Sequence, residues 1–310
     1  LFPILKFIKS FLLIIKDANM YICNYILKSI LSMILLLSFA KNAFSQEKID
    51  DIEVIGISPL PGIEIDRNKI PNSSQSLREI DLDSSTGTTI VDLLGEKLTG
   101  VTIKDVQNSP FQKNIDYRGF TAAPLLGESQ GLAVYLNGTR INEGFGDTLQ
   151  WELVPEAALT DIDLMSSNPV FGLNALGGSL ALTTKKGLDF LNTDSSVENH
   201  FEFGGADWVN GNIELGAGDE SQGLYVAMEN SYDGGWRDNS AGDVKRLFIN
   251  YGKIFENSDF DFTFMNADSN LNGNGVSPTE LLKVRRESVF TWPDFTSNKV
   301  YLAASNANFY

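Results

Sequence analysis

The sequence has little of the side-chain chemistry on which most enzymes and metalloproteins depend. Its 310 residues include one cysteine, Cys23, and one histidine, His200. A single cysteine excludes an intrachain disulfide and a cysteine-based metal site. A single histidine without gathered carboxylates indicates neither a metal centre nor a catalytic triad. We therefore expect no catalytic residues, no metal and no cofactor, and we interpret His200 as an ordinary strand residue.

Positive charge is also scarce. Lysine and arginine total 24 against 40 acidic residues, which gives a formal net charge of −16. A chain of this charge without a basic stripe repels the phosphate backbone, so nucleic acid is excluded as a partner. The glycine loop 172–178 lacks the Gly-Lys-Ser/Thr ending of a phosphate-binding loop, which argues against a nucleotide site. Its glycines are better explained by turns and close packing.

Long apolar runs are confined to residues 1–45. From Met20, a plausible second start, lysine precedes an apolar stretch over 30–40, and the small residues Ala43 and Ser45 permit cleavage before Gln46. This layout predicts a secretory signal peptide. The alternative is a membrane-anchoring helix, but the apolar stretch is short for the roughly 20 residues that a span needs. The sequence leaves the true start, Leu1 or Met20, open.

Residues 46–80 read as a polar, proline-containing linker, and 81–187 as an α+β domain. Apolar residues at helical spacing predict a helix over 88–98, which Gly100 ends. Short strands are expected at 101–103, 115–117 and 132–136. Asn137 and Gly138 form a strong tight-turn signal after the last of these.

Residues 188–310 contain alternating segments separated by turns rich in glycine, asparagine and aspartate. One face of each is apolar and the other small or polar, as in transmembrane β-barrel strands, although a soluble β-sandwich also alternates. The export signal favours antiparallel barrel strands. One long excursion is expected over 268–298. The six segments are 198–204, 211–217, 224–232, 245–253, 260–267 and 299–310.

Six strands cannot close a barrel around a domain of about 100 residues, since even eight strands enclose a space that side chains fill. An open edge in lipid would leave backbone groups without partners. We therefore expect the chain to be the N-terminal part of a longer protein.

Four motifs in order resemble the plug domain of TonB-dependent outer-membrane receptors. They are Ile90–Leu94 with Thr99-Gly100-Val101, the segment 116–120 (Asp-Tyr-Arg-Gly-Phe), the strand and turn 133–138, and the strand–loop–strand segment 162–185. The residues that carry the plug motifs are Arg118, Gly119, Asn137, Gly138, Gly172, Gly177 and Gly178. Asn168-Pro169 replaces the usual Gly-Pro, and Phe171 replaces tyrosine.

The resemblance implies that plug arginines pair with barrel glutamates. Asp161 stands where an arginine is usual, which puts one such pair in doubt, and Arg118 is the candidate for the other. The resemblance also implies a TonB box, a short segment near the mature N-terminus that a TonB-type periplasmic energy transducer binds as an added strand. We assign it to Asp51, Ile52, Glu53, Val54, Ile55 and Gly56; the alternative is that this segment is the first plug strand.

In this family, apical plug loops and extracellular loops contact the substrate. The candidates lie in 119–130 and 142–151, where side chains on loops suit small-molecule recognition, or serve only to pack the loops. They are Phe120, Glu128, Phe145, Asp147 and Trp151. The resemblance thus implies an energised importer in the cell outer membrane, in contact with the lipid bilayer and a small substrate such as a siderophore, vitamin or oligosaccharide. The alternatives are a truncated, non-transporting surface binding protein and a passive porin.

Overall fold

The computed structural model of the chain describes residues 54–56, 64–66, 73–83, 89–105, 107–166, 172–292 and 294–310, all within one unit, 50–310. The expected signal peptide lies outside the described residues. The first described elements are β1 (Val54–Gly56) and β2 (Glu64–Asp66), which pair antiparallel.

Two small sheets and one helix build the expected α+β domain. The larger sheet has the order β3-β9-β10-β7-β8, in which β10 and β7 are parallel and the other pairs antiparallel. The smaller sheet has the order β4-β5-β6. The strands are β3 (Ser74–Arg78), β4 (Val101–Asp105), β5 (Lys113–Tyr117), β6 (Phe120–Ala122), β7 (Leu132–Leu136), β8 (Thr139–Arg140), β9 (Leu159–Ser166) and β10 (Gly178–Thr184).

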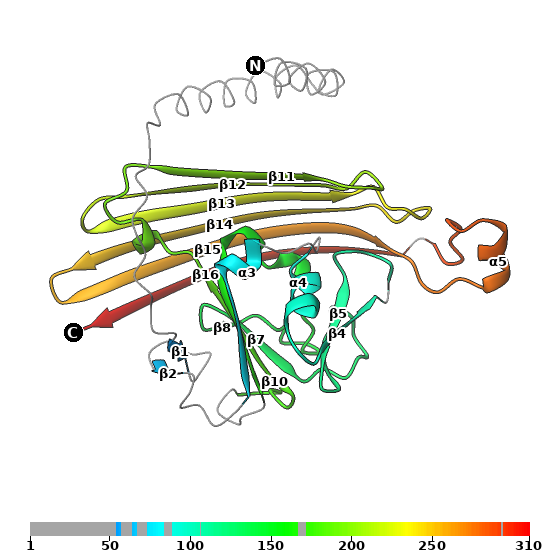
Figure 1. The fold of residues 1–310 in the computed structure, drawn as a ribbon, viewed down its shortest axis with the longest axis horizontal. Helices are drawn as coiled ribbons and strands as arrows, with labels where there is room; N and C mark the ends of the chain where they lie inside the picture. The colour runs from blue at the N-terminus through cyan, green and yellow to red at the C-terminus, as the bar shows by residue number, and fades with distance from the viewer. Residues whose placement is uncertain are drawn as a thin grey trace, which may run out of the picture. The chain divides into compact units, whose positions relative to one another are not determined.

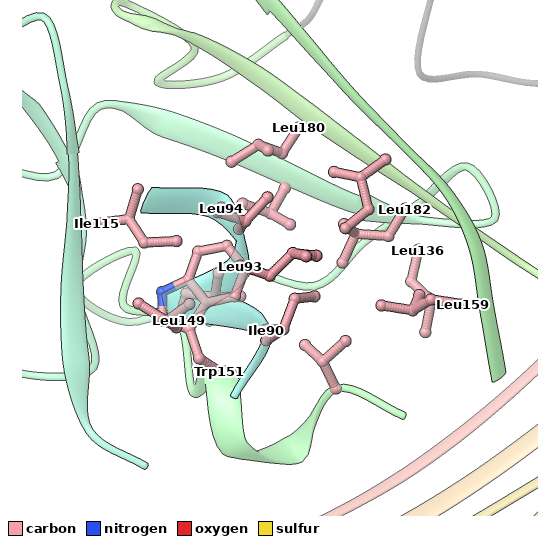
Figure 2. Packing of buried hydrophobic residues seen from close by; sticks show 14 of the residues in the cluster. Ile90, Leu93, Leu94, Ile115, Leu136, Leu149, Trp151, Leu159, Leu180 and Leu182 are labelled. Carbon is pink, nitrogen blue, oxygen red and sulfur yellow. The ribbon is translucent and has the colours of Figure 1, made fainter. Parts of the chain in front are cut away.

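Helix α4 (Ile90–Lys97) confirms the helix predicted over 88–98. Thr89 is its N-cap, and Gly100 follows its end with φ of +81°. Because its apolar residues recur at helical spacing, one face is buried and meets Leu180 and Leu182 of β10 and the indole of Trp151 (Figure 2). Fully burying each such side chain contributes about 1.5–3 kcal/mol. The other helical segments are α3 (Glu79–Asp83), η3 (Trp151–Leu153), η4 (Glu156–Ala158) and η6 (Gly187–Phe190).

The second part of the unit is a single antiparallel sheet of six strands in chain order (Figure 1). All six alternating segments predicted from the sequence are strands. Their bounds are β11 (Ser196–Phe203), β12 (Val209–Gly218), β13 (Gln222–Asp233), β14 (Gly242–Phe255), β15 (Ser258–Gly273) and β16 (Asp294–Phe309). Among the described strands, β11 and β16 each pair on one edge only, so the sheet is open.

Burial in this sheet is the reverse of that in a soluble sandwich. On β13, Leu224 and Met228 are 43% and 41% exposed, whereas Tyr225 and Glu229, which each follow one of them, are buried against the α+β domain. On β15, the inward Asp261 and Thr263 are buried and Phe262 faces outward. A face that exposes apolar side chains and buries polar ones is that of a barrel strand whose outside meets lipid. This decides between the two interpretations that alternation alone left open.

The excursion predicted over 268–298 is too long. Strand β15 continues to Gly273 and β16 begins at Asp294, so the connection covers 274–293 and contains α5 (Thr279–Val284). The prediction ended the strand where its outward residues become polar, at Asp268 and Asn270. Their inward neighbours Ser269 and Leu271 remain buried, because alternation continues beyond the apolar band.

Candidate functional site: the contact between plug and strands

A buried arginine joins the strands to the α+β domain. Arg246 of β14 is 5% exposed, and its guanidinium donates three hydrogen bonds. Nε donates to the main-chain oxygen of Glu152 at 2.6 Å, Nη1 to Glu229 of β13 at 2.9 Å, and Nη2 to Glu156 at 3.0 Å. A rigid guanidinium fork suits such a site better than an ammonium group. Because Glu152 and Glu156 belong to η3 and η4, one side chain of the sheet holds two segments of the domain.

A second ionic contact lies where the domain leads into the strands. Lys185 Nζ is 2.7 Å from Glu214 of β12, 3.5 Å from Glu79 and 3.8 Å from Glu198. Tyr225 donates its hydroxyl to the same Glu214 carboxylate at 2.7 Å. Burial by itself lowers the pKa of Lys185, but the hydrogen bond and charge of Glu214 outweigh it and raise the pKa above its ordinary value.

The resemblance implies ion pairs between plug arginines and barrel glutamates at positions 118 and 161. Neither residue forms such a pair among the described residues. Asp161, in the place of an arginine, accepts from Arg78 of β3 at 3.1 Å, so this pair lies within the domain. Arg118 is exposed and lies over the ring of Tyr117, 4.9 Å from its centroid, with no ion pair among the described residues. The pairing of Arg118 with a barrel glutamate therefore stays a prediction. Arg246 was missed because a lone arginine in an alternating strand carries no sequence signal.

The strand connections differ in length at the two ends of the sheet. Connections 219–221 and 256–257 are short, and 204–208, 234–241 and 274–293 are longer. The loop between β4 and β5 lies at the long-loop end: the main-chain oxygen of Gln107 accepts from Asn274 N at 2.8 Å, and Phe111 stacks on Trp208 with centroids 5.4 Å apart.

Several amide side chains near the long-loop end of the six-stranded sheet are buried without a hydrogen-bond partner. Both amide atoms of Gln112 and of Asn114 lack a hydrogen-bond partner, although each residue is 1% exposed. Trp208 Nε1 and Asn274 Oδ1 also lack one. Unpaired buried polar atoms cost about 1–3 kcal/mol each. Gln107 Oε1 is buried without a partner as well, and we refer to Gln107, Gln112, Asn114, Trp208 and Asn274 together as the amide cluster.

The five predicted substrate residues fall into two groups. Phe145 and Glu128 are exposed on loops, Phe145 at 78%. Trp151 is 1% exposed and donates Nε1–H to Ala122 O at 3.1 Å, as a core residue would. Asp147 binds Arg140 and Asn174, which ties the loop down. Phe120 is half-buried, and its side chain lies against Gly131 and Gly177.

The plug-motif glycines have separate physical roles. Asn137 and Gly138 both have positive φ, at 48° and 80°, as a tight turn after β7 requires. Gly172 has φ of +84°, and Gly119 has φ of +86°. At Gly177 a Cβ would lie within 3.0 Å of the Phe120 ring, so only glycine fits there. Gly178 opens β10 beside Met165 and Ser166 of β9.

The assigned TonB box is described in part. Val54, Ile55 and Gly56 form β1, which pairs with Glu64–Asp66, and Asp51, Ile52 and Glu53 lie outside the described residues. Extended backbone here fits both a TonB box and a first plug strand. No group of three or more histidine, cysteine or acidic residues in the described chain is arranged to hold a metal ion. No described helix is long and apolar enough to cross a membrane.

Residues 66–179 match the family model of the TonB-dependent Receptor Plug Domain. A comparison of the sequence with curated proteins found no match. Many solved structures are similar. The unliganded ferric citrate transporter FecA has a TM-score of 0.62 and 17% identity, over 77% of this chain and 37% of its own.

Two more of the similar structures are receptors with bound ligands. The ferripyoverdine receptor of the outer membrane of Pseudomonas aeruginosa has a TM-score of 0.62 and 12% identity, over 82% of this chain and 34% of its own. A double mutant of the Serratia marcescens hemophore receptor HasR, in complex with its hemophore HasA and heme, has a TM-score of 0.53 and 17% identity, over 65% of this chain and 32% of its own. This chain spans about a third of the length of these proteins. At such identities the likeness shows the fold.

Proposed function

We propose that this chain, which carries a TonB-dependent receptor plug domain and the first strands of its barrel, is part of an outer-membrane receptor for energised uptake of a small substrate. The observation that carries the proposal is the reversed burial of the six-stranded sheet. Its polar face, with Arg246 and Glu229, meets the plug, and its apolar face has no protein partner among the described residues.

The outward face of β14 has the height of a bilayer band. Lys253 and Lys245 share that face, and Tyr251, Ile249 and Leu247 lie between them. At about 3.3 Å per residue the two lysines are about 26 Å apart along the strand. A tilt of about 40° leaves roughly 20 Å of height, close to the apolar band of about 25 Å in outer-membrane barrels. This supports a place in the outer membrane, which the chain would reach through the signal peptide that the sequence predicts within 1–45.

The two ends of the sheet support an orientation. Outer-membrane barrels have short periplasmic turns and longer extracellular loops. The connections 204–208, 234–241 and 274–293 would then face outside, and the amide cluster would lie beneath them. Neutral amide side chains suit a ligand rich in hydroxyl or amide groups, and we expect the exposed Phe145 and Glu128 to contribute from other plug loops.

Energy coupling rests on residues 51–56. In the proposed cycle, ligand binding releases this segment into the periplasm, where a TonB-type transducer pairs with it as an added strand. Force on the segment would loosen the plug against the contacts at Arg246 and Lys185. A passive porin needs neither the plug nor this segment, and a non-transporting binding protein would hold ligand without delivering it.

Uptake in matched strains tests the proposal. The complete gene is deleted and restored, and uptake of labelled ferric siderophores, cobalamin, haem, thiamine and oligosaccharides is measured with and without a protonophore. We expect restored uptake of one class, abolished by the protonophore. Uptake that ignores the protonophore would indicate a passive pore, and surface binding without uptake would indicate a non-transporting binding protein.

A further inference from the structure

Three carboxyl groups and one guanidinium meet at the contact between the plug and the strands. The carboxyl groups are those of Glu152 in η3, Glu156 in η4 and Glu229 in β13, around Arg246. Arg246 is the only base within the described residues that forms an ion pair with any of the three. One guanidinium cannot neutralise three carboxylates in a buried site, where an uncompensated charge is costly.

Glu152 differs from the other two in its contacts. Arg246 binds Glu229 and Glu156 through their carboxylates but binds Glu152 through its main-chain oxygen. The Glu152 side chain accepts from neutral donors at one oxygen, Oε1: Asn298 Nδ2 at 3.0 Å and Ser269 Oγ at 3.3 Å. Its other oxygen has no partner, and the residue is 1% exposed.

We propose that Glu152 holds a proton while the plug is docked, and that loss of this proton weakens the contact of the plug with strands β14, β15 and β16. An ionised Glu152 would face the two carboxylates that already share Arg246. Asp92 of α4 acts on Glu156 in the same direction, although Lys113 pairs with Asp92 at 2.6 Å. The remaining side chains in contact with Glu152, Ser269 and Asn298, are neutral and cannot offset it.

The direction in which pH changes the strength of docking follows from the pKa of Glu152 in the docked state. Burial raises the pKa of Glu152 above its ordinary value, and the hydrogen bonds of Asn298 and Ser269 and the charge of Arg246 only partly oppose this. The docked state therefore binds more protons than a state in which Glu152 meets water. Docking is then strongest at low pH and weakens as pH rises from the ordinary value of 4.5 towards the raised pKa.

Hydrogen–deuterium exchange of the intact receptor in detergent tests this device. Protection of residues 151–158 is compared between wild type and Glu152→Gln across pH 5 to 9, and the ratio cancels the intrinsic pH dependence of exchange. Glutamine keeps the shape and an acceptor for Asn298 but cannot ionise. We expect the protection of wild type relative to the variant to be highest at the lowest pH, to fall by up to about tenfold per pH unit between the ordinary value of 4.5 and the raised pKa, and to level off above the raised pKa.

Two controls separate charge from structure. Glu96→Gln, at an exposed acid on α4, should leave the wild-type profile unchanged. The carboxylic-acid C=O stretch, recorded by infrared spectroscopy at neutral pH, should lose one band in Glu152→Gln. A ratio that is constant with pH, or an infrared spectrum unchanged by the substitution, would overturn the proposal. Neither readout requires transport. This proposal can therefore fail while the proposed importer function stands, and the importer function can fail while this proposal stands.

Discussion

Gly187 of η6 and Gly223 of β13 approach each other backbone to backbone where the plug leads into the strands. A Cβ built on either glycine would lie closer than 3.0 Å to the carbonyl oxygen of the other. Gly187 N also donates to Asn250 Oδ1 at 2.6 Å. The chain can therefore cross the inner face of the sheet at this point only without side chains, and this crossing fixes where the plug sits against β13 and β14.

Substituting this crossing should loosen the plug. Gly187→Ala places a methyl group against the backbone of Gly223, and overpacking of this kind costs about 1–3 kcal/mol. We expect faster proteolysis of the plug in the intact receptor. Gly205→Ala is the matched control, because a Cβ there meets nothing within 4 Å. Equal proteolysis of the two variants would show that the crossing tolerates a side chain.

The ion pair of Lys185 and Glu214 should be worth more than an exposed pair. Lys185→Met leaves the Glu214 carboxylate, whose side chain is 12% exposed, without its base. Both side chains are partly buried, so we expect a loss between the roughly 1 kcal/mol of an exposed pair and the roughly 3–5 kcal/mol of a buried pair. Chemical denaturation of the plug measures the loss, and Glu214→Gln in the same chain should recover part of it.

A surface pair serves as the comparison for Lys185. Lys104 binds Asp116 at 3.0 Å but is 59% exposed, so Lys104→Met should cost no more than about 1 kcal/mol. If both lysine variants lose the same stability, the contact at Lys185 does not hold the plug.

The stability of the plug should depend on the guanidinium shape of Arg246 as well as on its charge. Arg246→Met strands Glu229 and Glu156 as buried carboxylates, and we expect a loss of about 3–5 kcal/mol in plug stability. Arg246→Lys keeps the charge but cannot reach three acceptors in a fixed fork, so it should be intermediate. Denaturation of the plug at one fixed pH ranks the three proteins. A lysine variant equal to wild type would contradict the role given to the fork.

A charged residue on the outward face of β14 should lower the free energy of unfolding more, the nearer it lies to the middle of the apolar band. Ile249, midway between Lys245 and Lys253, marks the middle of the apolar band, whereas Tyr232 lies beyond Lys245 in the neighbouring strand. Ile249→Arg should cost about 2–4 kcal/mol and Tyr232→Arg about 0–1 kcal/mol. Equilibrium unfolding from lipid vesicles measures both. Equal costs would argue that this face does not meet lipid.

The sequence predicted local elements well, because each depends on neighbouring residues. Helix α4, strand β7 and the turn at Asn137 and Gly138 follow from spacing and turn chemistry alone. The contacts between plug and strands depend on residues far apart in the chain: Arg246 meets Glu156 across 90 positions. Alternation shows which residues share a face but not which side chain lies opposite another. Asp161 illustrates this, since its base, Arg78, lies on the neighbouring strand.

The most direct test of the account is uptake by the complete receptor lacking residues 51–56, measured beside its surface binding of the same labelled substrate. The account predicts that uptake falls to the level of the gene deletion while binding at the surface is unchanged. The transducer would then have lost its strand, but the ligand-facing end of the plug would be intact. Unchanged uptake would contradict energised import through this segment.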